Sequence, residues 1–201
     1  MRAVGIFVKA PVPGRVKRRL AADIGPSSAA EVYWRLGRQV VGSTVGAGHR
    51  TTVWFTPERE GRFVREWLEG LGRVAFRAQR GAGLGARLTH AFAAEFATGA
   101  RRVVIVGSDC PGVDRRMIRG AFTALGEHDL VLGPALDGGY YLIGLTAPRP
   151  ALFRAIRWST AAVAVQTRAR ARALGLSCHL LKPLRDVDTV RDAHLLGLLN
   201  S

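Results

Sequence analysis

The sequence is poor in lysine, acidic residues and cysteine, and it has no long apolar run. Only three of its 30 basic residues are lysine and only 15 residues are acidic, so the net charge at pH 7 is +15. The two cysteines, Cys110 and Cys178, form no CxxC spacing, which argues against a zinc site or a secreted disulfide scaffold. No apolar stretch reaches the roughly 20 residues of a bilayer-spanning helix, and residues 1–8 lack a signal-peptide pattern. We therefore expect a cytoplasmic protein without a membrane span.

The excess of positive charge favours an anionic partner, either nucleotide phosphates or nucleic acid. Arginines follow expected helix faces, as in RARARA at residues 168–173, without the interleaved aromatic residues of a single-strand-binding platform. The sequence also lacks a helix-turn-helix or RNP motif. We interpret the charge as a solvated basic surface and expect no specific nucleic-acid partner.

Short β-rich runs alternate with helical patterns along the chain, which is typical of an α/β fold. Val32, Leu36 and Val40 recur every four residues behind two serines that are candidate N-caps, and predict a helix. The run VVIV at residues 103–106 is apolar throughout, as in a strand buried on both faces of a mostly parallel sheet. We expect one domain, residues 1–201, because the chain has no repeat and no long linker. The expected strands are residues 3–8, 51–55, 74–78, 103–106, 130–132, 140–145 and 178–181, and the expected helices are residues 28–45, 58–71, 84–98, 115–125, 160–174 and 189–199.

Polar residues that follow strands are the candidates for a site, because ligands of open parallel sheets bind beyond the carboxyl ends of the strands. In the first such segment, Lys9 and Lys17 flank a loop that two prolines stiffen. Gly14 allows a tight turn or a close approach of backbone to a ligand, and the next helix would offer free N–H groups to an anion. The segment suits a diphosphate, with a basic surface turn as the alternative. It is not a Walker A loop, since GxxxxGK[ST] is absent.

Acidic residues follow three later strands. Asp109, after the VVIV strand, suits Mg²⁺ together with substrate phosphates, or the start of a helix. Asp186 and Asp188 are two residues apart, so in an extended segment their carboxylates point the same way and repel unless a cation or proton compensates them. A metal site and a charge pair at a helix N-terminus both explain this spacing. Residues 137–139, DGG, predict a turn whose backbone can approach a ligand.

The glycine-rich segment at residues 79–88, QRGAGLGARL, does not fit GxGxxG, and no suitable acidic residue lies about 20 positions further on. A dinucleotide site is therefore not predicted. A loop that closes over a nucleotide and a plain connection both explain this segment.

Five motifs together resemble a bacterial glycosyltransferase-like family of the GT-A nucleotide-diphospho-sugar transferase superfamily. This family is related to phospholactate guanylyltransferase and molybdenum-cofactor guanylyltransferase. The motifs occur in the family's order over about 180 residues, and are KAPVPGRVKxRL, VVIVGSDCP, DxVLGPAxDGGYYLIGL, LFRAIRWST and LRDVDT.

The resemblance implies a three-layer α/β/α sandwich with a mostly parallel central sheet, and Mg²⁺ or Mn²⁺ as cofactor. Carried over by position, Lys17 and Asp109 would be catalytic, and Asp186 and Asp188 would complete the metal's shell with Asp109. Ser159 would touch the acceptor or belong to a helix cap. The residues expected to contact the nucleotide or acceptor are Lys9, Ala10, Pro11, Gly14, Lys17, Arg19, Gln79, Gly85, Arg87, Ser108, Asp137, Gly138, Gly139, Ser159 and Thr160.

The sequence departs from the family's pattern at four positions. Arg18 stands where threonine is usual, Gly83 and Ala86 stand where acidic residues are usual, and Leu136 stands where glutamate commonly precedes DGGY. The three lost acidic groups and the added cation alter the charge at the mouth of the site.

We therefore expect a metal-dependent transferase that uses an activated nucleotide, in the first place a glycosyltransferase that breaks the sugar–phosphate bond of an NDP-sugar. One alternative is a guanylyltransferase-like nucleotidyltransferase that joins an NTP to a small phosphorylated acceptor and releases pyrophosphate. A non-catalytic nucleotide-binding paralogue and a nucleic-acid-binding protein are further alternatives. The expected partners are a nucleotide or nucleotide sugar and a small-molecule acceptor, and the sequence leaves a homodimer open.

Overall fold

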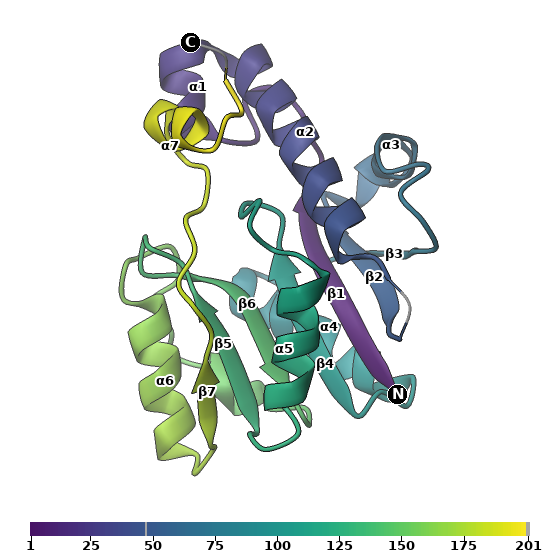
Figure 1. Cartoon of the computed structure of the whole chain (residues 1–201), viewed down its shortest axis with the longest axis vertical. Coiled ribbons are helices and arrows are strands. Elements are labelled where there is room, and N and C mark those ends of the chain that lie inside the picture. The colour runs from purple at the N-terminus through teal and green to yellow at the C-terminus, as the bar shows by residue number, and fades with distance from the viewer. Residues whose placement is uncertain (47, 200–201) are drawn as a thin grey trace.

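A computed structural model describes residues 1–46 and 48–199. In this part of the chain, a seven-stranded sheet has the strand order β3-β2-β1-β4-β6-β5-β7 (Figure 1). Its pairs are parallel except for β6, which runs antiparallel to both β4 and β5. The mostly parallel sheet that the sequence predicts is thus confirmed, as a mixed sheet. The strands are β1 (Arg2–Lys9), β2 (Arg50–Thr56), β3 (Ala75–Ala78), β4 (Arg102–Gly107), β5 (Leu130–Pro134), β6 (Tyr140–Leu145) and β7 (Cys178–Leu180).

Helices cover both faces of the sheet, which makes three layers. Alternate residues of the central strands point to opposite faces, so that Val104 and Val106 join one apolar cluster while Val103 and Ile105 join the other. The first cluster packs against α2, α3 and α5, and the second packs against α4, η2 and α6. The helices are α1 (Arg18–Ile24), α2 (Pro26–Thr44), α3 (Gly61–Trp67), α4 (Leu84–Ala97), α5 (Arg115–Ala124), α6 (Val163–Ala173) and α7 (Val190–Leu195), with 3₁₀ turns η1 (Glu58–Glu60) and η2 (Pro150–Phe153). No helix of the described residues is long and apolar enough to cross a membrane.

Several predicted helix ends are wrong, and glycine or proline explains most of them. α2 begins at Pro26, directly after Gly25, so the two serines expected to cap it lie inside its first turn. The predicted helix 58–71 is a 3₁₀ turn followed by α3, and a glycine with positive φ, Gly70, lies soon after α3. α7 stops at Leu195, two residues before a glycine with positive φ. α6 starts three residues later than predicted, because residues 157–162 form turns.

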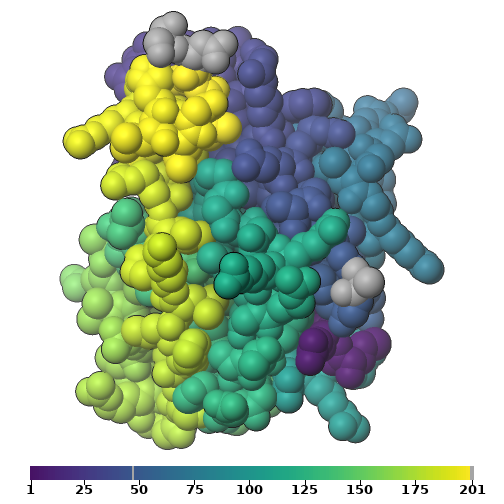
Figure 2. Space-filling model, viewed as in Figure 1, coloured from purple at the N-terminus to yellow at the C-terminus, as the bar shows by residue number. Residues whose placement is uncertain are grey.

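The sheet and two short helices set the position of the site. α1 and α7 contact each other and lie beyond the edge of the sheet at which β1 and β4 end (Figure 1). The chain between β7 and α7 crosses one side of the molecule as a continuous band (Figure 2). In this band, the N–H of Val187 donates to the carbonyl of Asp109 at 3.0 Å, which ties the segment before α7 to the loop after β4. Residues remote in sequence therefore meet at one edge of the sheet.

Candidate functional site

A cleft of about 560 Å³ lies at this edge. Its walls come from the residues after β1, β3 and β4 and from the start of β6, which reaches the same edge because it runs antiparallel to its neighbours. The predicted site residues that line the cleft are Lys9, Lys17, Arg19, Gln79, Arg87, Ser108, Asp109, Ser159 and Asp188.

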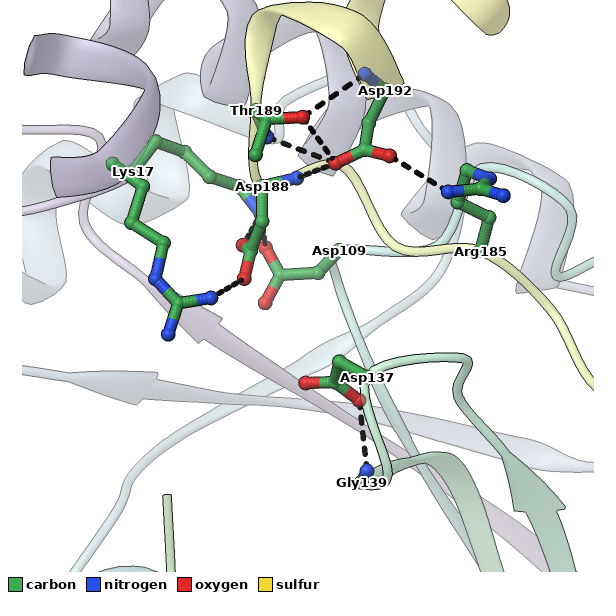
Figure 3. A network of polar contacts seen from close by, with 9 residues as sticks. Lys17, Asp109, Asp137, Gly139, Arg185, Asp188, Thr189 and Asp192 are labelled. Atoms are coloured by element: carbon green, nitrogen blue, oxygen red, sulfur yellow. Dashed lines mark hydrogen bonds and ion pairs between the residues drawn. The ribbon is translucent and has the colours of Figure 1, made fainter. Parts of the chain in front are cut away.

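Lys17 joins three segments of the chain. Its Nζ lies 2.5 Å from Oδ1 of Asp109 and 3.4 Å from Oδ1 of Asp188, and only 4% of its side chain is exposed. Burial by itself lowers the pKa of Lys17, but the attraction of Asp109, followed by that of Asp188 and Asp186, outweighs it and raises the pKa above its usual value. Lys17 is therefore a buried ammonium paired with carboxylates, and Figure 3 shows these side chains facing one another.

Tyr33, in α2, lies under this ammonium and was not predicted as a site residue. Its ring centroid is 5.9 Å from Nζ of Lys17. Its hydroxyl accepts from the N–H of Lys9 at 2.9 Å and shares a 2.7 Å hydrogen bond with Oγ of Ser108. Burial, with the nearby charge of Asp109, raises the pKa of Tyr33, so it is a neutral phenol that braces the ends of β1 and β4. A tyrosine inside a helical pattern carries no sequence signal for this role.

Three carboxylates gather beside the Lys17 pair. Asp137, Asp186 and Asp188 each offer an oxygen atom, and these atoms lie within 4.8 Å of one another. The predicted set was Asp109, Asp186 and Asp188, but Asp109 pairs with Lys17 and Asp137, expected to contact substrate, completes the trio instead. Asp137 comes from the turn between β5 and β6, where its Oδ1 also accepts from the N–H of Gly139 at 2.8 Å.

The chemistry of this trio fits a hard divalent cation. Burial, aided by repulsion from Asp137 and Asp188, raises the pKa of Asp186 to about 6. Such repulsion shows that the carboxylates lack full compensation by positive charge, although Lys17 is close. Clustered carboxylate oxygens are the ligands that Mg²⁺ and Mn²⁺ prefer. The metal role of these residues stays a prediction, and the donor set suits it.

A capping box at the start of α7 fixes the position of Asp188. Oδ2 of Asp192 accepts from the N–H groups of Asp188 and Thr189 at 3.3 and 3.0 Å, and from Oγ1 of Thr189 at 2.7 Å (Figure 3). Its Oδ1 accepts from Nη1 of Arg185 at 3.1 Å. Burial opposes ionisation of Asp192, but the hydrogen bonds from Thr189 and Arg185 outweigh it and lower the pKa. The spacing TxxD is a capping-box signal that could have identified Asp192 from the sequence.

Other predicted contacts lie away from the cleft surface. A Cβ at Gly85 would come within 2.9 Å of Nε1 of Trp158, and one at Gly138 within 2.1 Å of the carbonyl oxygen of Ala161, so packing inside the protein accounts for both glycines. Thr160 donates to the carbonyl of Arg157 and accepts from the N–H of Ala162, which makes it a turn residue. Substrate contacts at Gly85, Gly138 and Thr160, as at Ala10, Pro11, Gly14 and Gly139, stay predictions.

Comparison with known proteins identifies the family. Residues 44–160 match a family described as "Uncharacterized protein conserved in bacteria (DUF2064)". The chain belongs to this family. It is also similar to the crystal structure of a "putative nucleotide-diphospho-sugar transferase" from Desulfovibrio desulfuricans G20, with 34% sequence identity and a TM-score of 0.91 over 97% of this chain and 85% of that one. A search of curated proteins gave no significant match.

Two further structures share the fold of this family member at low sequence identity. CMP:2-keto-3-deoxy-manno-octonic acid synthetase complexed with CTP has 12% identity and a TM-score of 0.56, covering 98% of this chain and 99% of that one. Rv0371c of Mycobacterium tuberculosis H37Rv, solved with manganese, has 14% identity and a TM-score of 0.52, covering 98% of each chain. The chain thus shares its fold with a putative nucleotide-diphospho-sugar transferase and with these two structures.

Replacing Asp192 by alanine should loosen the segment that carries Asp188. Loss of the capping box should lower the free energy of unfolding by about 1 to 2 kcal/mol. Because the N–H groups of Asp188 and Thr189 lose their acceptor, their amide hydrogen exchange should accelerate about tenfold. Asp114→Ala is the matched control, since Asp114 caps α5 through the N–H of Met117 and does not line the cleft. If the amide hydrogens of residues 188 and 189 exchanged equally fast in both variants, this would contradict the role of Asp192 in positioning Asp188.

Replacing Asp186 by asparagine should stabilise the metal-free protein at high pH only. The raised pKa means that folded Asp186 holds its proton more tightly than the unfolded chain does, so its contribution to stability is present below about pH 4 and is lost as the pH rises through about 6. Asp186→Asn does not ionise, and in chelator its melting temperature should exceed that of the wild type by about 6–12 °C at pH 8, because a rise of about two pKa units corresponds to about 3 kcal/mol. At pH 4 the two should coincide; a difference that is the same at both pH values would rule out the repulsion.

Proposed function

We propose that this family member is a metal-dependent glycosyltransferase that uses a nucleotide sugar as donor. The observation that carries the proposal is the close approach of the Lys17 ammonium to Asp109 and Asp188, which line the cleft, together with the trio that Asp188 forms with Asp137 and Asp186. A buried cation next to clustered carboxylates offers both halves of a diphosphate–metal site. The 34% identical relative from Desulfovibrio supports a nucleotide-sugar donor.

In this proposal, the basic side chains of the cleft bind the diphosphate of the donor. Lys17 supplies a buried point charge, and Lys9 and Arg19 add exposed cations that line the same cleft. Tyr33 holds the ends of β1 and β4 at a fixed separation, so that the phosphate-binding groups are positioned before the donor arrives. Asp186 and Asp188, with Asp137 or Asp109, would hold Mg²⁺ or Mn²⁺, which neutralises negative charge on the leaving diphosphate.

Residues after β3 and in α4 line a part of the cleft that suits the nucleobase. Nε2 of Gln79 donates to the carbonyls of Val8 and Trp54 at 3.2 and 2.8 Å. Because both amide hydrogens are used, Oε1 of Gln79 is left as a fixed acceptor in a cleft-lining residue. Arg87 lines the cleft nearby in sequence and offers donors, while Leu84 and Leu88 add apolar surface. A hydrogen-bond acceptor and donors can pair with the polar edge of a nucleobase, and the apolar side chains can pack against its ring.

In the transfer itself, the bond between the anomeric carbon and the diphosphate oxygen breaks, and a bond from an acceptor nucleophile to the anomeric carbon forms. The electron pair of the broken bond stays on the diphosphate, which leaves as NDP, and the acceptor's proton passes to solvent or to a carboxylate of the cleft. Nucleotidyl transfer is the second candidate, because a fold relative is solved with CTP. In that case the α-phosphate would be attacked and pyrophosphate released.

A thermal-shift panel of NTPs and nucleotide sugars, each with Mn²⁺ and with chelator, tests the proposal. A donor at about 100 times its Kd should stabilise the wild type by about 2.7 kcal/mol, and only with Mn²⁺. Lys17→Met should weaken that donor at least tenfold, because a charge-assisted contact is lost. Lys182→Met is the matched control, since it removes the same charge from a lysine that does not line the cleft.

Mass detection of the products then separates the two reactions. Release of NDP supports glycosyl transfer, and release of pyrophosphate supports nucleotidyl transfer. Stabilisation of the wild type by no nucleotide of the panel, or an equal loss of affinity in Lys17→Met and Lys182→Met, would contradict the site.

A further inference from the structure

Lys17 occupies a position that a metal ion would also seek. Its Nζ contacts Asp109 at 2.5 Å and Asp188 at 3.4 Å, and Asp188 is at the same time a member of the carboxylate trio. Two cations that need the same carboxylate oxygens repel each other at such distances, whatever the exact screening. A divalent ion that enters alone must therefore share Asp188 with an ammonium that is already bound there.

The ammonium has nowhere to go in the absence of an anion. Only 4% of the Lys17 side chain is exposed, and the Tyr33 ring lies 5.9 Å from Nζ on another side. A buried charge that loses its partner is costly, so Lys17 leaves its carboxylates only for an equivalent anion. A phosphate oxygen of a bound nucleotide is such an anion, and accepts from an ammonium as a carboxylate does.

We propose that Lys17 makes the cleft select a divalent metal that arrives with a diphosphate over the free metal ion. Asp188, the carboxylate that belongs to both the Lys17 pair and the trio, would become available to the metal ion when a phosphate oxygen takes its place beside the Lys17 ammonium. Metal and phosphate then bind with positive coupling, since each removes the obstacle to the other. This inference rests on the proposed function and adds that the metal ion enters the cleft together with the diphosphate.

The identity of the residue supports this exchange. Lys17 lies among arginines, in the segment RVKRR, within a chain that has only three lysines. An arginine at position 17 could grip a carboxylate with two parallel hydrogen bonds, whereas an ammonium on a flexible stem holds it as a point charge that can change partner. Neighbouring Arg19 reaches Asp188 at 3.5 Å but is 77% exposed, so it can retreat into solvent without a new partner.

Binding of Mn²⁺ to the purified full chain at pH 7.5 tests the exchange, with water-proton relaxation enhancement as the readout of protein-bound Mn²⁺. The probes are Mn²⁺ alone and Mn²⁺ with inorganic pyrophosphate. In the wild type, pyrophosphate should lower the dissociation constant of Mn²⁺ from the protein at least tenfold. Lys17→Met should bind Mn²⁺ alone at least tenfold more tightly than the wild type, and should lose the gain from pyrophosphate.

Two further variants distinguish the competition between Lys17 and the metal ion from two other effects, the loss of one positive charge anywhere in the protein and a folding defect. Lys182→Met should bind Mn²⁺ within threefold of the wild type under both conditions, because it removes an equal charge outside the cleft. Lys17→Arg keeps a cation beside Asp109 and Asp188, and its melting temperature, measured next to that of Lys17→Met, shows whether each variant is folded. Lys17→Arg should bind Mn²⁺ alone no better than the wild type and should gain less than threefold from pyrophosphate.

The outcomes distinguish this inference from the proposed function. If the wild type binds Mn²⁺ with pyrophosphate and Lys17→Met binds free Mn²⁺ no more tightly than the wild type, the competition is wrong and the metal site stands. A full pyrophosphate gain in Lys17→Arg would also overturn the exchange. If neither the wild type nor Lys17→Met binds Mn²⁺ with or without pyrophosphate, the metal site and the proposed function fail together.

Discussion

The pairing of the Lys17 ammonium with Asp109 and Asp188 holds the functional edge of the molecule together. It joins the start of α1, the loop after β4 and the segment before α7, which lie far apart in sequence. Because the ammonium is buried, the fold tolerates it only while an anionic partner lies beside it. Tyr33 below it and the Asp192 capping box behind Asp188 restrict the same three segments. Stability and ligand binding therefore depend on one set of charges.

The elements of the fold could be predicted from the sequence because hydrophobic pattern and strand length are local. The VVIV run and the every-fourth-residue stripe of α2 are examples, and both elements exist where they were expected. The order of strands in the sheet is a non-local property. β6 lies between β4 and β5 and runs antiparallel to both, which no local pattern encodes. Because of this placement, the turn between β5 and β6 brings Asp137 close to Asp186 and Asp188, the carboxylates that precede α7.

The candidate site was predictable to the extent that it follows strand ends. Lys17, Asp109 and Asp188 were identified because polar residues after strands gather at one edge of a sheet, and the structure brings them together. Distances of a few ångströms decide which carboxylate forms an ion pair with Lys17 and which carboxylates are left without a counter-ion. Sequence spacing does not resolve such distances, so Asp109 was grouped with Asp186 and Asp137 was not. Tyr33 was missed because its function comes entirely from its neighbours in space.

Of the four departures from the family's pattern, Arg18 lines the cleft directly after Lys17, and the other three do not line it. Gly83 precedes the first residue of α4 with a φ of 95°, a conformation that favours glycine, and Ala86 lies in the first turn of the same helix. That turn contains no acidic residue and carries Leu84 and Arg87, which line the cleft. Leu136, which precedes Asp137 in the sequence, is 58% exposed. The departures therefore change the charge of the cleft at Arg18 and leave in place the five groups to which the proposed function assigns the metal and the diphosphate, Lys17, Asp109, Asp137, Asp186 and Asp188.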